Sequence, residues 1–202
     1  MNYLTQIIVD KTIVLRQRLT DSYAWHQVFW QSFPGRHGQE RCFLSRVDYR
    51  DRYYQALLLS EDEPAALEWG EWATKAITPS FLEHSHYRFA LRANPTIKRV
   101  VRDEQGERRK NGRREAIYDR DTLREWLDRK GQEGRFEILQ LDFDPPVSRP
   151  FRRRGVTGKH VSVDYRGVLR VLDRQAFQET FRKGVGPAKA FGFGLLMLQP
   201  IH

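Results

Sequence analysis

Two side chains, Tyr23 and His26, are the best suited to proton transfer in this sequence. They lie in a segment with helical periodicity, where residues at i and i+3 are neighbours on one face. Histidine exchanges a proton near neutral pH, and a phenol can donate a proton or orient a phosphate. Cleavage of RNA by its own 2′-hydroxyl needs a proton acceptor, a proton donor for the leaving 5′-oxygen, and positive charge at the phosphorus. Spacing shows which residues are neighbours but not what they do, so the alternative that His26 is only a solvated histidine stays open at this point.

The helix that carries this pair is predicted over residues 24–33, with Asp21 or Ser22 as its N-cap. On a wheel of about 100° per residue, its apolar stripe consists of Trp25, Val28, Phe29, Ser32 and Phe33. Tyr23, His26 and Trp30 fall on a different face, turned by about 100–160° from Trp25. We therefore expect the pair to lie off the face that packs on the core.

A glycine-rich segment, residues 184–194 with the sequence GVGPAKAFGFG, is the second candidate site. Glycine lets the backbone approach a ligand closely, and successive backbone N–H groups make an anion-binding concavity. Lysine adds a mobile charge suited to phosphate. We therefore predict phosphate contacts from Lys183, Gly184, Gly186 and Lys189, with residues 195–198 as a strand that anchors the loop. A dinucleotide fingerprint is excluded, because Lys189 stands where its third glycine belongs.

Positive charge gathers in the same part of the chain. Residues 149–202 hold 11 Lys and Arg against 3 Asp and Glu, and so carry nearly all of the net charge of +9. The densest run is formed by Arg149, Arg152, Arg153, Arg154 and Lys159. Such a footprint is typical of a polyanion-binding protein. Nucleic acid is favoured over an acidic membrane surface, because no basic amphipathic helix or lipidation motif accompanies the charge.

Hydrophobic periodicity predicts the elements that must hold these residues. In the first part, we expect strands at 3–9, 41–47 and 52–59, a short helix at 64–69, and a strand before Pro79. In the second part, we expect strands at 87–93, 136–143, 161–172 and 195–198, with helices at 121–130 and from Asp173 to Lys183. The charged segment 98–114 has no apolar period and is predicted to be a loop, disordered or ordered by RNA.

Both parts follow the order strand, helix, strand, strand, helix, strand. Two such βαββαβ units in tandem are the ferredoxin-like pattern, so the predicted fold class is α+β with two tandem ferredoxin-like domains. Residues 1–85 form the expected N-terminal domain, which carries the helix with Tyr23 and His26. Residues 86–202 form the expected C-terminal domain, with the basic RNA-binding surface and the glycine-rich loop. The duplication rests on element order, since no internal sequence repeat is visible.

Composition argues against several other classes. No run of about 18 apolar residues is present to span a membrane, and the first residues lack the basic and apolar regions of a secretory signal. The single cysteine, Cys42, excludes an internal disulfide and a paired-cysteine metal site. His84 and His86 have no carboxylate or cysteine at ligand spacing. We therefore expect a cytoplasmic protein that is independent of structural zinc and has no cofactor.

Three segments carry a resemblance to a known family. Residues 184–196, GVGPAKAFGFGLL, resemble the glycine-rich loop of the CasE-type CRISPR repeat endoribonucleases of type I-E systems, within the RAMP superfamily. Residues 87–96, YRFALRANPT, resemble the strand that opens the second domain of that family. Residues 23–26, YAWH, resemble its active-site helix. Order and spacing agree along the whole chain, while residues 97–150 match only in general character.

The resemblance implies two tandem ferredoxin-like folds and a metal-independent endoribonuclease that cuts at the 3′ side of a CRISPR repeat hairpin. The product would end in a 2′,3′-cyclic phosphate. His26 matches the general acid–base histidine of the family, Tyr23 matches its companion, and Lys159 falls where the family places a basic residue at the RNA. The resemblance further implies that the protein stays on its product RNA and joins the other subunits of the type I-E surveillance complex. The scissile phosphate would then lie at the junction of the two domains.

Two other interpretations stay open. A non-catalytic RNA-binding scaffold subunit of the same superfamily would use the loop and the basic surface without cleaving RNA. A DNA-binding regulator would bind duplex DNA, although no helix-turn-helix pattern supports it.

Overall fold

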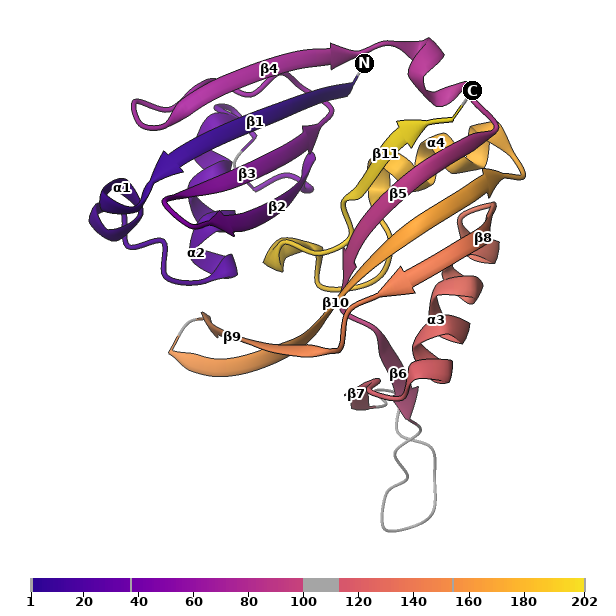
Figure 1. Ribbon diagram of the computed structural model, residues 1–202. Coiled ribbons are helices and arrows are strands. Elements are labelled where there is room, and N and C mark those ends of the chain that lie inside the picture. The colour runs from indigo at the N-terminus through magenta and orange to yellow at the C-terminus, as the bar shows by residue number, and fades with distance from the viewer. Residues whose placement is uncertain (1, 37, 100–112, 154, 202) are drawn as a thin grey trace.

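The chain forms two antiparallel sheets that lie side by side (Figure 1). The computed structural model describes residues 2–36, 38–99, 113–153 and 155–201. One sheet has the strand order β2-β3-β1-β4, and the other has the order β11-β5-β10-β8, with β9 paired to β10. Strands β6 and β7 form a separate two-stranded ribbon. We call β1 to β4 with their helices the N-terminal half, and β5 to β11 with theirs the C-terminal half.

The N-terminal half confirms the predicted strands. Its elements are β1 (Asn2–Asp10), α1 (Lys11–Arg16), α2 (Ser22–Phe29), the 3-10 turn η1 (Trp30–Ser32), β2 (Phe43–Arg50), β3 (Tyr53–Ser60) and β4 (Glu71–Ile77). The helix predicted over residues 24–33 is thus an α-helix followed by a 3-10 turn. The short helix α1 was not predicted; the carboxylate of Asp10 caps it by accepting the N–H of Thr12.

The helix predicted over residues 64–69 is wrong, because the chain runs there as an irregular segment. The N–H of Ala65 donates to the carbonyl of Ser32, which is not a helical bond. Leu67 and Trp69 pack against the apolar core of the N-terminal half, in the position that a second helix would fill. Gly70 ends the segment with a φ of 78°, a left-handed conformation that a helix cannot contain.

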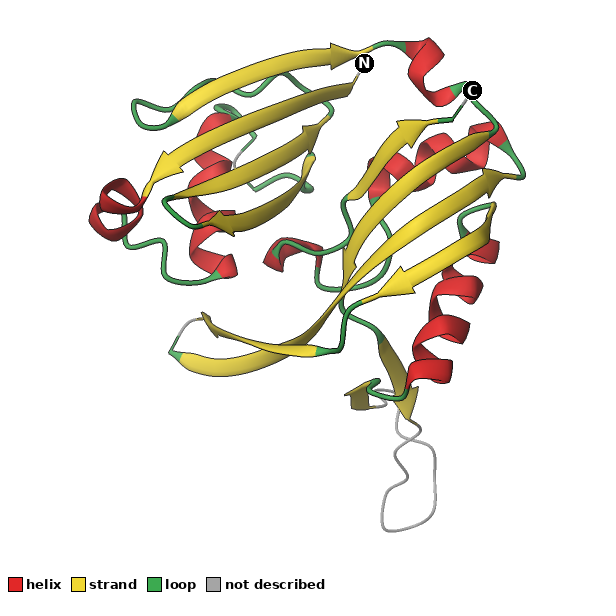
Figure 2. Cartoon of the chain, viewed as in Figure 1, coloured by secondary structure: helices red, strands yellow, loops and turns green. Residues whose placement is uncertain are grey.

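The C-terminal half begins after the 3-10 turn η2 (Pro79–Leu82). Its elements are β5 (His86–Ala93), β6 (Thr96–Arg99), β7 (Arg113–Ala116), α3 (Arg120–Glu133), β8 (Phe136–Phe143), β9 (Val147–Arg153), β10 (Val156–Val171), α4 (Arg174–Lys183), the 3-10 turn η3 (Lys189–Phe191) and β11 (Leu196–Pro200). Helices α3 and α4 cover one face of the sheet (Figure 2), where Trp126 and Phe177 are buried.

The other predicted elements of this half are confirmed, with two extensions. The strand expected at 161–172 begins earlier, at Val156, because it pairs with the unpredicted strand β9 to make a long hairpin arm. The charged segment 98–114 forms β6 and β7 at its two ends, and the rest of that predicted loop lies outside the described residues.

The strand order confirms the α+β class with two related sheets. In each half the first strand, β1 or β5, lies between the third and the last strand of a βαββαβ order. The halves meet through a shared apolar cluster that joins Leu44 and Leu59 of one half to Phe181 and Leu195 of the other. Within the described ranges, no helix combines the length and the apolar character that crossing a membrane requires.

Candidate functional site

Helix α2 starts at a carboxylate that also holds the hairpin arm of the C-terminal half. Oδ1 of Asp21 accepts the N–H groups of Tyr23 and Ala24, both at 2.9 Å. Oδ2 of the same carboxylate accepts the N–H of Arg152, on β9, at 2.8 Å. Capping by aspartate fixes the first turn of a helix. Asp21 therefore positions Tyr23 and at the same time brings β9 beside it.

Tyr23 contacts the glycine-rich segment directly. Its ring stacks on Phe191 of η3, with 5.6 Å between ring centroids and 30° between the planes. In Figure 1 this segment, in yellow, projects from the C-terminal half toward α2. The two segments that the sequence singled out, more than 160 residues apart, thus form one site.

His26 lies in the same helix but is buried, with only 6% of its surface exposed. Its ring packs on Phe43 of β2 at a centroid distance of 5.2 Å, and the indole Nε1 of Trp30 donates to its Nε2 at 3.2 Å. An indole N–H can only donate, so this Nε2 carries no proton, and a neutral ring holds its proton on Nδ1. The prediction that the pair lies off the core is therefore wrong for His26. Phe43 comes from a distant strand, which a helical wheel does not contain.

The glycine-rich segment packs closely against the N-terminal half, and some of its N–H groups are already hydrogen-bonded within the protein. The N–H of Gly184 donates to Thr180 and that of Gly194 donates to Arg92, both at 2.8 Å. The N–H of Gly184 is therefore not available to a phosphate, while the phosphate contact predicted for Gly186 stays a prediction. Gly184 has a φ of 76°, and a Cβ there would lie 2.7 Å from Cδ1 of Leu44 on β2. Glycine is needed because the loop rests against the other half of the protein.

Packed aromatic rings, which the sequence did not reveal, hold this loop against the hairpin arm formed by β9 and β10. The ring of His160 stacks on Phe151, with centroids 4.6 Å apart, and meets Phe191 edge-on at the same distance. The Nδ1 of His160 lies 3.2 Å from the side-chain amide of Asn94. Burial lowers the pKa of His160. His160 therefore packs between the hairpin arm and the loop that carries Phe191.

The predicted basic run lies on the hairpin arm. Arg149 and Arg152 on β9 and Lys159 on β10 are exposed. Arg149 also lines a small cavity of about 40 Å³ together with Trp25 of α2 and Gly192 of the loop, which puts it at the junction of the halves. The protein packed around its guanidinium keeps some water away, and this loss of solvation, followed by the charge of nearby Arg92, lowers the pKa of Arg149. The side chain of Arg153, and all of Arg154, lie outside the described residues.

A basic groove of about 1150 Å³ lies on the helical side of the C-terminal half. The predicted residues Lys183, Gly184, Gly186 and Lys189 line it. Sequence reasoning missed the other cations in its wall, which are Lys98, Arg114, Arg129 and Lys130. Against these six cations, the described lining includes only two carboxylates, Glu133 and Glu179. The groove is therefore a second positive surface beside the loop, suited to a polyanion.

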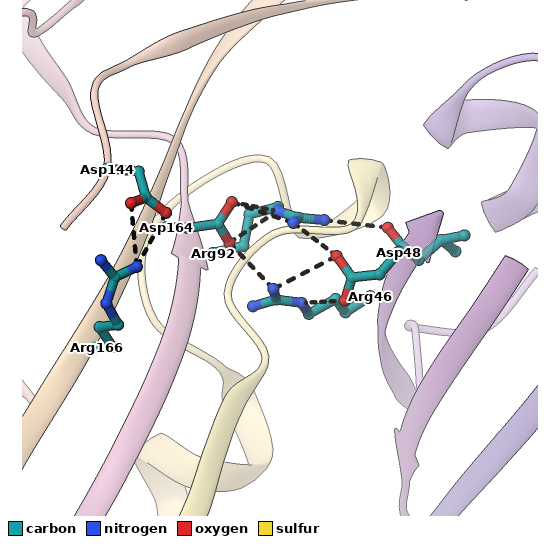
Figure 3. A network of polar contacts seen from close by, with 7 residues as sticks. Arg46, Asp48, Arg92, Asp144, Asp164 and Arg166 are labelled. Atoms are coloured by element: carbon teal, nitrogen blue, oxygen red, sulfur yellow. Dashed lines mark hydrogen bonds and ion pairs between the residues drawn. The ribbon is translucent and has the colours of Figure 1, made fainter. Parts of the chain in front are cut away.

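Buried ion pairs hold the two sheets in place around this site (Figure 3). Arg92 of β5 donates to Asp48 of β2 at 2.7 Å and to the carbonyl of Val47 at 3.1 Å. It also donates to Asp164 of β10 at 3.0 Å. Arg46 of β2 completes the network with contacts to both carboxylates, at 2.7 and 3.2 Å. Burial raises the pKa of Asp48, but the two arginines outweigh burial, so that its pKa lies below the ordinary value.

Metal ligands do not gather in the part of the chain that the structure describes: no three His, Cys, Asp or Glu side chains are placed to hold an ion there. The groups that the site does bring together are a phenol, an imidazole and several cations. Those groups can move protons and balance the charge of a phosphate.

Known proteins match this chain along nearly its whole length. The family model described as CRISPR associated protein matches residues 2–200. The chain is 32% identical to the CRISPR system Cascade subunit CasE of Escherichia coli K12 in an alignment of 203 positions, which covers 96% of this chain and 99% of CasE. It is also 32% identical to the CRISPR-associated endoribonuclease Cse3 of Thermus thermophilus in an alignment of 219 positions, which covers 98% of this chain and 100% of Cse3.

Solved structures agree with these relatives. The structure of Thermus thermophilus Cse3 bound to an RNA representing a pre-cleavage complex superposes with a TM-score of 0.80 and 26% identity. The match covers 98% of this chain and 99% of that one. The resemblance predicted from three short segments is thus confirmed over the whole fold. This protein belongs to the CRISPR-associated protein family.

Proposed function

We propose that this protein is an endoribonuclease that matures CRISPR RNA by cutting the precursor at the 3′ side of each repeat hairpin. The observation that carries the proposal is the stacking of Tyr23, on the helix that also carries His26, against Phe191 of the glycine-rich loop. Its relative Cse3 is an endoribonuclease that has been seen with RNA in a pre-cleavage complex, which supports the same activity here.

The proposed reaction is an attack by the RNA on itself. The 2′-oxygen bonds to the adjacent phosphorus, the bond from phosphorus to the 5′-oxygen breaks, and the products carry a 2′,3′-cyclic phosphate and a 5′-hydroxyl. One proton leaves the 2′-oxygen and one is delivered to the 5′-oxygen. We assign His26 as the acid–base group and Tyr23 as its companion. No step of this scheme requires a metal ion, because protein cations can balance the charge that develops on the phosphate.

Access to His26 requires a local movement. Its Nε2 is the basic nitrogen of the ring, and Trp30 covers it with a hydrogen bond. Trp30 is partly buried and packs on Phe43, so the mechanism requires its indole to swing away from Nε2 when RNA binds. In the proposed mechanism the substrate hydroxyl replaces the indole N–H at Nε2.

Binding is proposed to come mainly from charge and hairpin shape. Phosphates would follow the exposed Arg149, Arg152 and Lys159 of the hairpin arm and the cations of the basic groove. The arginine-rich end of the arm, Arg153 and Arg154, belongs to the same proposed contact by sequence.

The groove is expected to contribute to RNA affinity in a salt-dependent way. Replacing Arg129 with glutamine removes one cation of the groove and should weaken binding of repeat RNA. The slope of log K against log salt should become shallower by about one, because one fewer phosphate is neutralised. Titrations at several salt concentrations measure both. An Arg16→Gln control, at the end of α1, should leave the slope unchanged, and equal slopes for the two variants would contradict a role for the groove.

The hydroxyl and the ring of Tyr23 are expected to have separate effects. Tyr23→Phe keeps the stack on Phe191 and removes the hydroxyl, so the cleavage rate should fall about 100-fold, with a smaller loss of melting temperature than in Tyr23→Ala. Tyr23→Ala should lower both, because it also removes the contact with the loop. Single-turnover cleavage and thermal unfolding measure the two quantities. A Tyr23→Phe variant as fast as the wild type would leave the tyrosine a packing role only.

We further propose a division of labour between residues 1–85, which would carry the catalytic helix, and residues 86–202, which would carry most of the RNA surface. The change from β4 to β5, between Ile77 and His86, supports this boundary. Similarity to the Cascade subunit CasE supports membership of the type I-E surveillance complex. The proposed place of action is the cytoplasm, where the precursor transcript is made.

A repeat RNA with one modified sugar tests this function. The CRISPR repeat from the protein's own genome is prepared with and without a 2′-deoxy nucleotide on the 5′ side of the cut. We expect cleavage of the unmodified RNA and equal binding but no cleavage of the modified RNA, because the attacking group is missing. Tight binding of the unmodified RNA without cleavage would instead favour the scaffold subunit.

A further inference from the structure

Two cations near the candidate site have no acidic partner. The Nε of Arg41 is buried and makes no hydrogen bond within the described residues. Lys189, the first residue of η3, is also partly buried. Neither side chain forms an ion pair with any carboxylate in the described ranges. Most buried charges in proteins are paired, so these two are exceptions that need a cause.

Each of these two cations lies two residues before a ring that contacts the proposed catalytic pair. Arg41 precedes Phe43 by two residues, and the Phe43 ring packs on His26. Lys189 precedes Phe191 by two residues, and the Phe191 ring stacks on Tyr23. The turn η3 contacts both α2 and β2. Lys189 thus lies in a turn that contacts α2, and Arg41 lies just before β2, the strand that this turn also contacts.

The electrostatics of this junction favour an anion. Burial, and then the charges of Arg41 and Lys130, lower the pKa of Lys189. Burial likewise lowers the pKa of Arg41. Two like charges that are both partly removed from water raise the free energy of the unliganded protein. A bound anion between them would relieve that cost, as charged donors bind phosphate oxygens strongly.

We propose that Arg41 and Lys189 bind the non-bridging oxygens of the scissile phosphate and stabilise the extra negative charge of the transition state. This inference rests on the proposed function and adds Arg41 to its catalytic residues. It assigns a second role to Lys189, beyond general attraction of RNA. Arginine suits the position because its planar fork can hold two phosphate oxygens at once.

Replacing Arg41 with glutamine separates this role from a structural one. The single-turnover cleavage rate should fall about 100-fold, as when one donor to a developing oxyanion is removed. The melting temperature of the free protein should stay equal or rise, because a buried unpaired charge is gone. Arg16→Gln, which removes an equal charge from exposed helix α1, serves as the control and should cleave at the wild-type rate.

A sulfur substitution at the scissile phosphate shows whether the contact is direct. Sulfur at one non-bridging position should slow the wild type and leave the rate of Arg41→Gln nearly unchanged, because the contact it disturbs is already missing. A rate for Arg41→Gln equal to that of Arg16→Gln would overturn the inference, and so would a lowered melting temperature with the full sulfur effect retained. In either case wild-type cleavage would leave the proposed function standing, whereas a wild type that does not cleave would refute that function itself.

Discussion

The His26→Asn substitution is expected to lower the single-turnover rate of repeat cleavage about 1000-fold. The affinity of this variant for RNA should stay within about threefold of that of the wild type. Asparagine keeps a polar group of similar reach beneath Trp30 but cannot exchange a proton near neutral pH. The His26 ring is buried against Phe43, so it contributes little to the protein surface that RNA can contact. Rates are measured with protein in excess over RNA, because slow release of product would mask the chemical step.

A second histidine provides the matched control. His86 begins β5, on the far side of the sheet junction from α2, and its ring contacts only Ser85 among the hydrogen-bonding groups described. His86→Gln should therefore cleave at the wild-type rate. Comparable losses in the two variants would mean that the loss is not specific to His26, and an unchanged rate in His26→Asn would remove His26 from the chemistry.

Arg92→Met is expected to reduce the free energy of unfolding by about 3–5 kcal/mol. Methionine has a similar length but leaves Asp48 and Asp164, both largely buried, without one of their two shared partners. Arg46 still contacts both carboxylates, yet it lies on β2 and cannot replace the link from β5. Urea unfolding measures the loss. Cleavage should fall as well, because the network sets the relation between α2 and the loop.

An exposed arginine in the same sheet calibrates this result. Arg166 pairs with Asp144 (Figure 3) and also with Asp142. About half of its side chain is exposed. Arg166→Met should cost less than about 1 kcal/mol, since exposed ion pairs contribute little. A loss in Arg92→Met no larger than in Arg166→Met would show that the network does not hold the halves together.

Local patterns in the sequence predict most of the elements correctly. Asp21 marks the start of α2 and Asp173 the start of α4, because each carboxylate accepts an N–H of the first turn. The order of strands and helices then leads to the α+β class. Local patterns failed at residues 64–69, where Pro64 fits a first helical turn but Leu67 and Trp69 are drawn into the core as irregular chain.

Contacts between segments that are far apart in the sequence form the site, and local sequence patterns cannot predict such contacts. The positions of Tyr23 and His26 on one helix follow from their spacing, but the burial of His26 depends on Phe43. The glycines of the C-terminal loop suggested free N–H donors, whereas Gly184 serves close packing on Leu44. Arg41 carries no motif at all. Its buried Nε has no hydrogen-bond partner among the described residues, and only the three-dimensional structure shows this.

The most direct test of the proposed cleavage is an analysis of the RNA ends. The protein is incubated with its cognate CRISPR repeat in excess EDTA, and the fragments are examined by mass spectrometry. The chemistry assigned to His26 and Tyr23 predicts one cut at the 3′ side of the hairpin, with a 2′,3′-cyclic phosphate on one fragment and a 5′-hydroxyl on the other. Cleavage that stops in EDTA, or fragments that end in a 3′-hydroxyl and a 5′-phosphate, would contradict it.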